Sequence, residues 1–554
     1  MKTIGFSNIT VGGELFDRAA HNFDRLEQPE YMPENVFKDG YEWPGDIEGR
    51  TILALVLLAQ ATKREPAHLK VILDEIPAHL NRKGYFGRIL PAGRFDEQQL
   101  SGNSWVLRGL CEYARWKTYE NVLGMIRNIV QNLLLPLKGY YAGYSIGLKD
   151  RIFVGGAIGN LAESASGNWY SSSDIGCAFI LLDGATQAYE ILRDEELASL
   201  IDEMIDKFLS IDFLMLSCQT HATLTALRGI LRYYEIKQDT KLLDAVISIF
   251  SLYTREAMTE NYGNYNWFGR PEWTEPCAIV DSFIIAVTLW KLTRDADYIG
   301  LAHNIYYNAL GYAQRPNGGF GCDVCVGPAG DYLTPVRELF EAYWCCTMRG
   351  GEGLARVVEY TYFLDDNTLF VPFYFESTVN THFSDGYVTF KLSTGYPFNG
   401  TVRIEILSST IKAGKSLHLY KPEWVEDDDV KVSINAQSVD FQINKGFIMI
   451  ALPCQKGDCI ELFFPIDIRK IGLVNSCQTG DAFRLAHGAL LLGVNNNDGK
   501  HIELGDGAQY DELGEGKYKN NNTDCMLSPI NNLIKLNMEE AKYDKRTIIF
   551  RVGL

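Results

Sequence analysis

The sequence predicts an α + β multidomain protein in which an (α/α)6 barrel is followed by antiparallel β-sandwich domains. Between about residues 45 and 365, apolar residues recur mostly with the period of a helix, in pairs of segments joined by short polar turns. After residue 366 the pattern changes to short alternating segments bounded by turn residues, as in the strands of a β-sandwich. We therefore expect a barrel domain with an extended N-terminal arm at residues 1–365. A β-sandwich region, with room for two small sandwiches, should follow at 366–554.

The composition fits this organisation and narrows the partners. With 46% hydrophobic residues, the 554-residue chain can bury a large core and build more than one domain. A net charge of −18 without a Lys/Arg cluster disfavours nucleic acid and anionic membranes as partners. The N-terminus lacks the apolar core of a signal peptide, so we expect a cytoplasmic protein whose 12 cysteines are free thiols or metal ligands. A homodimer is compatible with these features.

The first half reads as helical hairpins. Residues 1–40 alternate short apolar runs with glycine, as an extended arm does, and Asp46 and Glu48 then precede a helix predicted over 51–61, where we expect them to cap it. A sixth helical segment is predicted over 353–363, after a glycine-rich turn. Six hairpins would close into a toroid whose insertions gather over a central funnel. The polar turns of the first five lie at 62–65, 117–120, 192–194, 237–239 and 293–295.

Two loops of this half have the composition of sugar-binding segments. Residues 168–174 and 261–270 combine aromatic rings, including Tyr262 and Trp267, with amide and hydroxyl groups. Ordinary loop packing is the alternative, because buried Tyr and Trp side chains also need polar partners.

The second half consists of short predicted strands. They are bounded by turn signals and contain no cluster of candidate catalytic groups, and we expect Cys454, Cys459, Cys477 and Cys525 to be buried small residues instead of ligands. The segments lie at 368–375, 387–392, 401–407, 430–434, 447–452, 459–464, 489–493 and 547–552.

The adjacent pair Cys345 and Cys346 is the most distinctive motif of the chain. Neighbouring cysteines do not readily form a disulfide with each other, whereas two thiolates at one backbone corner can bind a soft metal such as zinc. Upstream, Glu275 and Cys277 supply a carboxylate and a third thiol two positions apart. These four residues are predicted to form a tetrahedral Zn²⁺ site.

A rival set remains open at this stage. Cys322 and Cys325 have the Cys-x2-Cys spacing of structural zinc sites and could join the cysteine pair in a closed four-thiolate site. The set with Glu275 has a different consequence, because a metal would keep Cys345 as a thiolate, the nucleophilic form of cysteine.

A nucleophile beside a sugar funnel suggests glycoside cleavage, which also needs a proton donor. Glu260 is placed best, on a loop that leads directly to Glu275 and Cys277. Glu256, one helical turn earlier, is its competitor.

Together these residues resemble glycoside hydrolase family 127, the β-L-arabinofuranosidase-like group. The resemblance covers most of the chain and is carried by the sequence Thr-Glu-Pro-Cys at 274–277, by residues 289–293 and 305–310, and by Cys345–Cys346. It implies an (α/α)6 barrel followed by β-sandwich domains and a retaining mechanism with a zinc-bound cysteine nucleophile. It implies Glu275, Cys277, Cys345 and Cys346 as the ligands, with Cys345 as the nucleophile.

The resemblance also bears on the acid/base and the sugar contacts. The family places a glutamate about sixteen residues before its ligand glutamate; Glu260 stands fifteen before Glu275, whereas Glu256 fits the local pattern only with a three-residue insertion. His221 matches a family histidine at the sugar subsite, although a structural histidine is the alternative. Asn103 and the region 171–174 stand where the family has two other histidines, and residues 347–351 differ from the family's Pro-Pro-Asn. We therefore expect Asn103, His221, Tyr262 and Trp267 to contact substrate, while the identity of the sugar stays open.

The resulting hypothesis is a zinc-dependent retaining glycoside hydrolase that acts on a small plant-derived or pectic oligosaccharide, with terminal β-L-arabinofuranose as the candidate sugar. Cys345 would be the nucleophile and Glu260 the acid/base. The alternatives are another (α/α)6-barrel sugar enzyme, either an epimerase or an unsaturated-glycoside hydrolase, and a non-catalytic carbohydrate-binding protein with a structural zinc.

Overall fold

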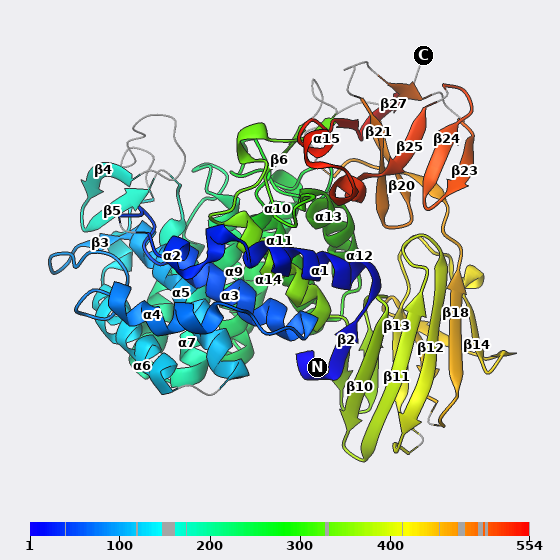
Figure 1. Ribbon diagram of the computed structural model, residues 1–554, viewed down its shortest axis with the longest axis horizontal. Coiled ribbons are helices and arrows are strands. Elements are labelled where there is room, and N and C mark those ends of the chain that lie inside the picture. Colours follow the sequence, from blue (N-terminus) through cyan, green and yellow to red (C-terminus); the bar gives the residue numbers. More distant parts are fainter. Residues whose placement is uncertain are drawn as a thin grey trace.

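A computed structural model describes residues 1–38, 40–117, 120–146, 161–172, 174–326, 332–412, 414–453, 455–474, 482–496, 502–504, 508–523 and 525–552. The chain forms a helical barrel and two β-domains, which lie beside the barrel (Figure 1). Cys454 and Cys477 lie outside the described residues. Cys459 and Cys525 are partly buried.

Six inner helices close into a ring. Each helix packs on the next in chain order, and the last packs back on the first, so the predicted (α/α)6 barrel is confirmed. The helices are α3 (Asp46–Thr62), α5 (Glu97–Trp116), α7 (Leu181–Leu192), α9 (Thr220–Lys237), α11 (Pro276–Thr293) and α14 (Cys346–Glu359).

An outer layer of helices covers this ring. Local sequence sets where two of these helices begin. The side chains of Asp194 and Asp239 accept hydrogen bonds from backbone N–H groups in the first turns of α8 and α10. The outer helices are α1 (Gly13–Leu26), α4 (Leu69–His79), α6 (Glu120–Ile129), α8 (Glu195–Leu209), α10 (Thr240–Glu256) and α12 (Asp297–Asn304).

The last inner helix differs from the prediction. A helix was expected over 353–363 after a glycine-rich turn, but α14 begins at Cys346 and runs through all of these glycines. They allow close packing instead of a turn: a Cβ on Gly350 would lie 2.1 Å from the Phe320 ring, and one on Gly353 would lie 2.6 Å from Val280. The helix therefore places Cys345 and Cys346 at its N-terminus.

Two facing sheets follow the barrel as a β-sandwich. The N-terminal arm is extended as expected, but it belongs to this sandwich: β1 (Lys2–Thr3) pairs with β8, and β2 (Ile9–Val11) pairs with β10. One sheet has the order β1-β8-β9-β13-β17-β16 and the other β15-β14-β18-β12-β11-β10-β2. Their other strands are β8 (Phe363–Asp365), β9 (Thr368–Val371), β10 (Ser377–Phe383), β11 (Gly386–Thr394), β12 (Gly400–Ser409), β13 (Ser416–Tyr420), β14 (Lys431–Ile434), β15 (Gln437–Ser438), β16 (Gln442–Asn444), β17 (Phe447–Ala451) and β18 (Cys459–Phe464).

A smaller, mainly antiparallel β-domain closes the chain. A hairpin of the barrel domain, β6 (Asp323–Val326) and β7 (Tyr332–Pro335), extends its sheet by pairing with β26. This hairpin lies between the two halves of the cysteine cluster in the sequence and ties the barrel mouth to the C-terminal domain. The strands of that domain are β19 (Ile468–Ile471), β20 (Ala482–His487), β21 (Leu490–Asn495), β22 (Glu503–Leu504), β23 (Tyr510–Gly514), β24 (Lys517–Asn520), β25 (Met526–Pro529), β26 (Arg546–Thr547) and β27 (Phe550–Val552), with the short helix α15 (Met538–Lys542) before β26.

Helix α11 is long and apolar enough to cross a membrane by composition alone, but 78% of that stretch is buried inside the protein. Its apolar surface is explained by its place in the inner ring, where α9, α12 and α14 pack against it.

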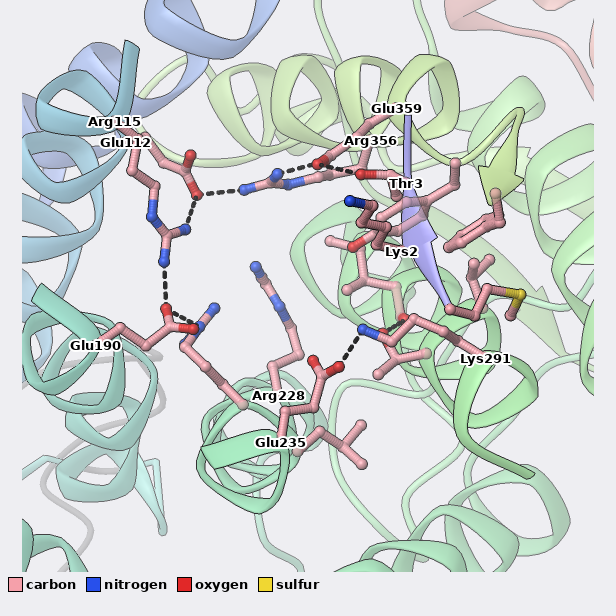
Figure 2. A pocket seen from close by; sticks show the side chains of 18 residues that line it. Lys2, Thr3, Glu112, Arg115, Glu190, Arg228, Glu235, Lys291, Arg356 and Glu359 are labelled. Atoms are coloured by element: carbon pink, nitrogen blue, oxygen red, sulfur yellow. Dashed lines mark hydrogen bonds and ion pairs between the residues drawn. The ribbon is translucent and has the colours of Figure 1, made fainter. Parts of the chain in front are cut away.

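Paired charges fill the barrel axis. Buried arginines and carboxylates from the inner helices form a connected network, which joins Arg108 to Asp183 and Glu352, Arg228 to Asp281 and Glu352, and Arg349 to Asp281. At the C-terminal ends of these helices lies a cavity of about 330 Å³. Ion pairs ring it (Figure 2): Arg115 with Glu190, Arg356 with Glu112, and Lys291 with Glu235. The cysteine cluster lies at the opposite mouth, where the inner helices begin.

Candidate active site

The predicted metal ligands meet at one point. Cys345 is the N-cap of α14, and Cys346 is the first residue of that helix. Glu275 is the N-cap of the neighbouring helix α11, and Cys277 is the second residue of α11. The Sγ of Cys346 lies 3.4 Å from that of Cys345 and 3.9 Å from that of Cys277. The ligand atoms of all four residues lie within 4.8 Å of one another. Tetrahedral zinc with Zn–S bonds of about 2.3 Å needs sulfur atoms about 3.8 Å apart, so this donor set fits Zn²⁺.

The three thiols of the cluster differ in exposure and acidity. Cys277 and Cys346 are buried, whereas Cys345 is partly exposed. Hydrogen bonds from the Cys277 and Cys346 thiols, together with the charge of Arg50, lower the pKa of Cys345. Burial raises the pKa of Cys277. Cys345 is therefore both the accessible thiol and the one that ionises first.

The rival four-thiolate set is not assembled. Cys322 lies against the Cys346 thiol and influences its pKa. Cys325 instead packs into a separate core with Tyr312 and Leu333. Because Cys325 lies on strand β6, its place is set by the pairing of that strand, which could not be read from Cys-x2-Cys spacing.

Arg50 is a neighbour of the cluster that the sequence did not single out. Its Nη1 lies 3.4 Å from the Cys277 Sγ, and its Nε lies 2.9 Å from the Asp46 carboxylate. The guanidinium also lies over the ring of Trp105, 4.2 Å from the centroid. This buried cation offsets part of the negative charge that three thiolates and a carboxylate would place here.

Several buried polar atoms at this mouth of the barrel have no hydrogen-bond partner among the described residues. They are contributed by the N-terminal halves of four inner helices: Asp46 Oδ1, Ser101 Oγ, Trp105 Nε1, His221 Nε2 and Glu275 Oε2. Unpaired buried polar groups are costly and usually mark a bound ligand, ion or water. Their common location indicates a site for a small polar molecule. Ser101 and Trp105 precede the axial Arg108 at helical spacing, a signal that the sequence contained.

His221 is held in a defined orientation. Its Nδ1 lies 2.9 Å from the Asp281 carboxylate, which also accepts a hydrogen bond from Thr225 at 2.7 Å and one from Arg228 at 2.6 Å. The ring stacks on Trp105, with the centroids 5.8 Å apart. The remaining nitrogen, Nε2, is buried and makes no hydrogen bond within the described ranges.

The side chains of the other predicted substrate contacts interact with other parts of the protein. Asn103 is fully buried, and its amide bonds to backbone groups of Phe86 and Gln99. Trp267 is buried and donates its Nε1–H to Asp174 at 3.0 Å. Tyr262 is half-buried, in a left-handed turn with φ of 63°, under the guanidinium of Arg484.

The two candidate proton donors have different surroundings. Glu260 is buried, and its Oε2 accepts the backbone N–H of Val474 at 2.8 Å and lies 3.3 Å from Arg484 Nε, so it joins the barrel mouth to the C-terminal domain. Glu256 is partly exposed at the end of α10 and pairs with its neighbour Arg255 at 2.8 Å.

Comparisons with known proteins agree with this architecture. Residues 368–466 match the sequence model of the GH127 middle domain of β-L-arabinofuranosidases. A structure of a GH127 β-arabinofuranosidase is 14% identical, with a TM-score of 0.74 over 100% of this chain and 98% of its own. The GH127 β-L-arabinofuranosidase Ara127N from Geobacillus stearothermophilus T6 is 15% identical, with a TM-score of 0.73 over 99% and 100%. A third structure, described as a glycoside hydrolase, is 13% identical, with a TM-score of 0.73 over 100% and 97%.

No curated protein sequence matches the chain. The match to the family model lies in the first sandwich, and the likeness to the solved structures extends the shared fold over the barrel and the last domain. The chain is thus GH127-like, in the sequence of its middle domain and in the fold of its whole length.

Proposed function

We propose that the protein is a zinc-dependent, retaining glycoside hydrolase with Cys345 as nucleophile, and that it removes a terminal β-L-arabinofuranosyl group from a small plant-derived or pectic oligosaccharide. One observation carries the proposal: three thiols and a carboxylate lie within 4.8 Å of one another, and Cys345 is the one thiol of that group that is partly exposed. The sugar specificity is taken from the described activity of the similar structures.

Glu275, Cys277, Cys345 and Cys346 would hold the zinc ion, which keeps the sulfur atoms as thiolates when it is bound. The N-terminus of α14 adds to this effect, because its free backbone N–H groups favour a negative charge at Cys345. The unpaired Nε2 of His221 and Nε1 of Trp105 would orient hydroxyl groups of the sugar.

The reaction would proceed in two displacements. The Cys345 sulfur attacks the anomeric carbon, a C–S bond forms, and the C–O bond to the leaving sugar breaks while Glu260 gives that oxygen a proton. Glu260 then takes a proton from water, whose oxygen attacks the same carbon, and the C–S bond breaks to restore the thiolate. Two inversions return the original anomeric configuration. Because Glu260 is paired with Arg484, this ion pair must loosen when the carboxylate takes up a proton.

The non-catalytic alternative needs a closed site of four thiolates. Cys325 lies in another core, and the fourth donor of the cluster is the carboxylate of Glu275. The donor set therefore favours a catalytic site over a structural zinc site.

The test is hydrolysis of an aryl β-L-arabinofuranoside by the zinc-loaded protein. Wild type should release the phenol, and NMR should show the β-anomer as the first product. Cys345→Ala should lose activity by at least about 10³-fold, in line with the loss of a catalytic nucleophile. Near-normal turnover by Cys345→Ala, or an α-anomer as first product, would refute the proposal.

A further inference from the structure

A second cavity lies on the same side of the barrel as the cysteine cluster, near the start of α3. It has a volume of about 530 Å³, within the range of small-molecule sites, and is formed by the segment before α3, the end of α4 and the loop before α5. Its lining includes Phe37, Tyr41, Glu48, His79 and Phe86. None of these five residues belongs to the cysteine cluster or to the ion pairs of the barrel axis.

The lining has the chemistry of a sugar site. Phe37 and His79 stack with centroids 4.0 Å apart, and Phe86 continues this aromatic wall. Flat aromatic faces suit the C–H face of a sugar ring, and carboxyl and amide groups suit its hydroxyls. The formal charges of the other lining residues balance, with Lys38 and Arg88 against Glu42 and Asp96. A neutral sugar therefore fits this cavity better than a uronic acid.

Glu48 supplies an unpaired polar group to this cavity. The residue is 6% exposed and lies in the first turn of α3, where a carboxylate ordinarily caps the helix. Capping does not account for its Oε2, because this buried atom has no hydrogen-bond partner in the part of the chain that the structure describes. Burial raises the pKa of Glu48 to about 8, so the group is a carboxylic acid at neutral pH. Such a group both donates and accepts a hydrogen bond, as a sugar hydroxyl does.

The cavity lies near the proposed nucleophile. Lys38 lines the cavity, and its Nζ lies 5.1 Å from the centroid of the Tyr343 ring, two residues before Cys345. Half a helical turn past Glu48, Arg50 reaches the Cys277 sulfur at 3.4 Å. One short stretch of α3 therefore contributes to both places.

We propose that this cavity is the subsite for the leaving sugar of the substrate, a neutral monosaccharide unit, and that Glu48 recognises one of its hydroxyl groups. The inference rests on the proposed function and adds to it the place of the leaving sugar and the residues that recognise it. Phe37 provides the stacking wall and Glu48 the polar contact.

The test compares two probes on full-length, zinc-loaded protein that carries Cys345→Ala, so that binding is measured without turnover. The probes are L-arabinose and a β-L-arabinofuranosyl disaccharide, titrated by calorimetry. Adding Glu48→Leu should weaken disaccharide binding about tenfold or more, the effect of leaving a hydroxyl unpaired, and should weaken L-arabinose binding less than threefold. Glu48→Gln keeps a donor and an acceptor and should stay within threefold for both probes. Glu75→Leu, on the exposed face of α4, is the matched control.

Phe37→Leu is the second variant, because it removes the aromatic wall without touching α3, and it should weaken disaccharide binding selectively as well. Equal losses for both probes, or no loss for the disaccharide, would overturn the proposal. If Cys345→Ala protein that has kept its zinc binds neither probe, the proposed function itself fails and the subsite fails with it, which is a different result from loss of selectivity. Melting curves and zinc content of each variant show whether it is folded and loaded.

Discussion

Replacement of Cys277 by serine should weaken zinc binding strongly, because Cys277 is one of the four donors that the described residues bring to the cluster. Four-ligand zinc sites bind with about 10–16 kcal/mol, so one ligand is worth roughly 2.5–4 kcal/mol, or about a 10²- to 10³-fold change in Kd. The neighbouring Arg50 adds to the loss, since its guanidinium would face a neutral hydroxyl instead of the sulfur 3.4 Å away. Competition against a chromophoric chelator at neutral pH measures the Kd.

Cys325→Ser is the matched control for this measurement. Cys325 is also a buried cysteine, but it packs in another core, so its replacement should leave the zinc Kd within about threefold. Unchanged affinity in Cys277→Ser would refute the assignment of the site. A loss in Cys325→Ser of the same size would show that the four-thiolate set forms in solution.

Further predictions concern neighbours of the site. Arg50→Gln should weaken zinc binding about 10- to 100-fold, as is typical for partners of metal ligands, while Arg50→Lys should recover part of it; equal affinity in all three proteins would show that the cation does not act on the cluster. Glu48→Gln should flatten the pH dependence of stability. Because the pKa of Glu48 is raised, wild type should lose on the order of a few kcal/mol of unfolding free energy as pH rises from 4.5 to about 8. The same pH dependence in urea denaturation of wild type and variant would contradict this. Asp281→Asn should lower the unfolding free energy by about 3–5 kcal/mol, because it leaves buried cations without their carboxylate, and a change below 1 kcal/mol would count against the axial network. Glu260→Gln should slow aryl-glycoside hydrolysis far more than Glu256→Gln, and the reverse order would move the acid/base role to the exposed residue.

Local chemistry made much of the fold predictable. Helical periodicity and turn residues placed the hairpins, and the aspartates at 194 and 239 cap helices as such residues do. The run of glycines in α14 misled the prediction, because glycine breaks isolated helices but is required where Phe320 and Val280 approach the backbone. Likewise, the N-terminal arm joins the sandwich through pairing across more than 350 residues, which no local pattern reveals.

The candidate site shows the same division. The four donors could be found from cysteine adjacency and spacing, since each lies at the start of an inner helix. Arg50 could not, because a cation inside a helix looks like an ordinary surface residue until the ring of helices turns it toward the cluster, where its guanidinium lies over the Trp105 ring. Asn103 was expected to contact substrate because of its place in the family pattern, and in the structure its amide hydrogen-bonds to the backbone.

Mass spectrometry of the denatured protein, quenched during turnover of an activated aryl β-L-arabinofuranoside, tests the nucleophile directly. The structure predicts one added pentosyl group on the peptide that contains Cys345, linked through sulfur and absent in Cys345→Ala. A protein that turns over the substrate while every cysteine peptide keeps its unmodified mass, or that carries the sugar on a carboxylate, would contradict the role of Cys345.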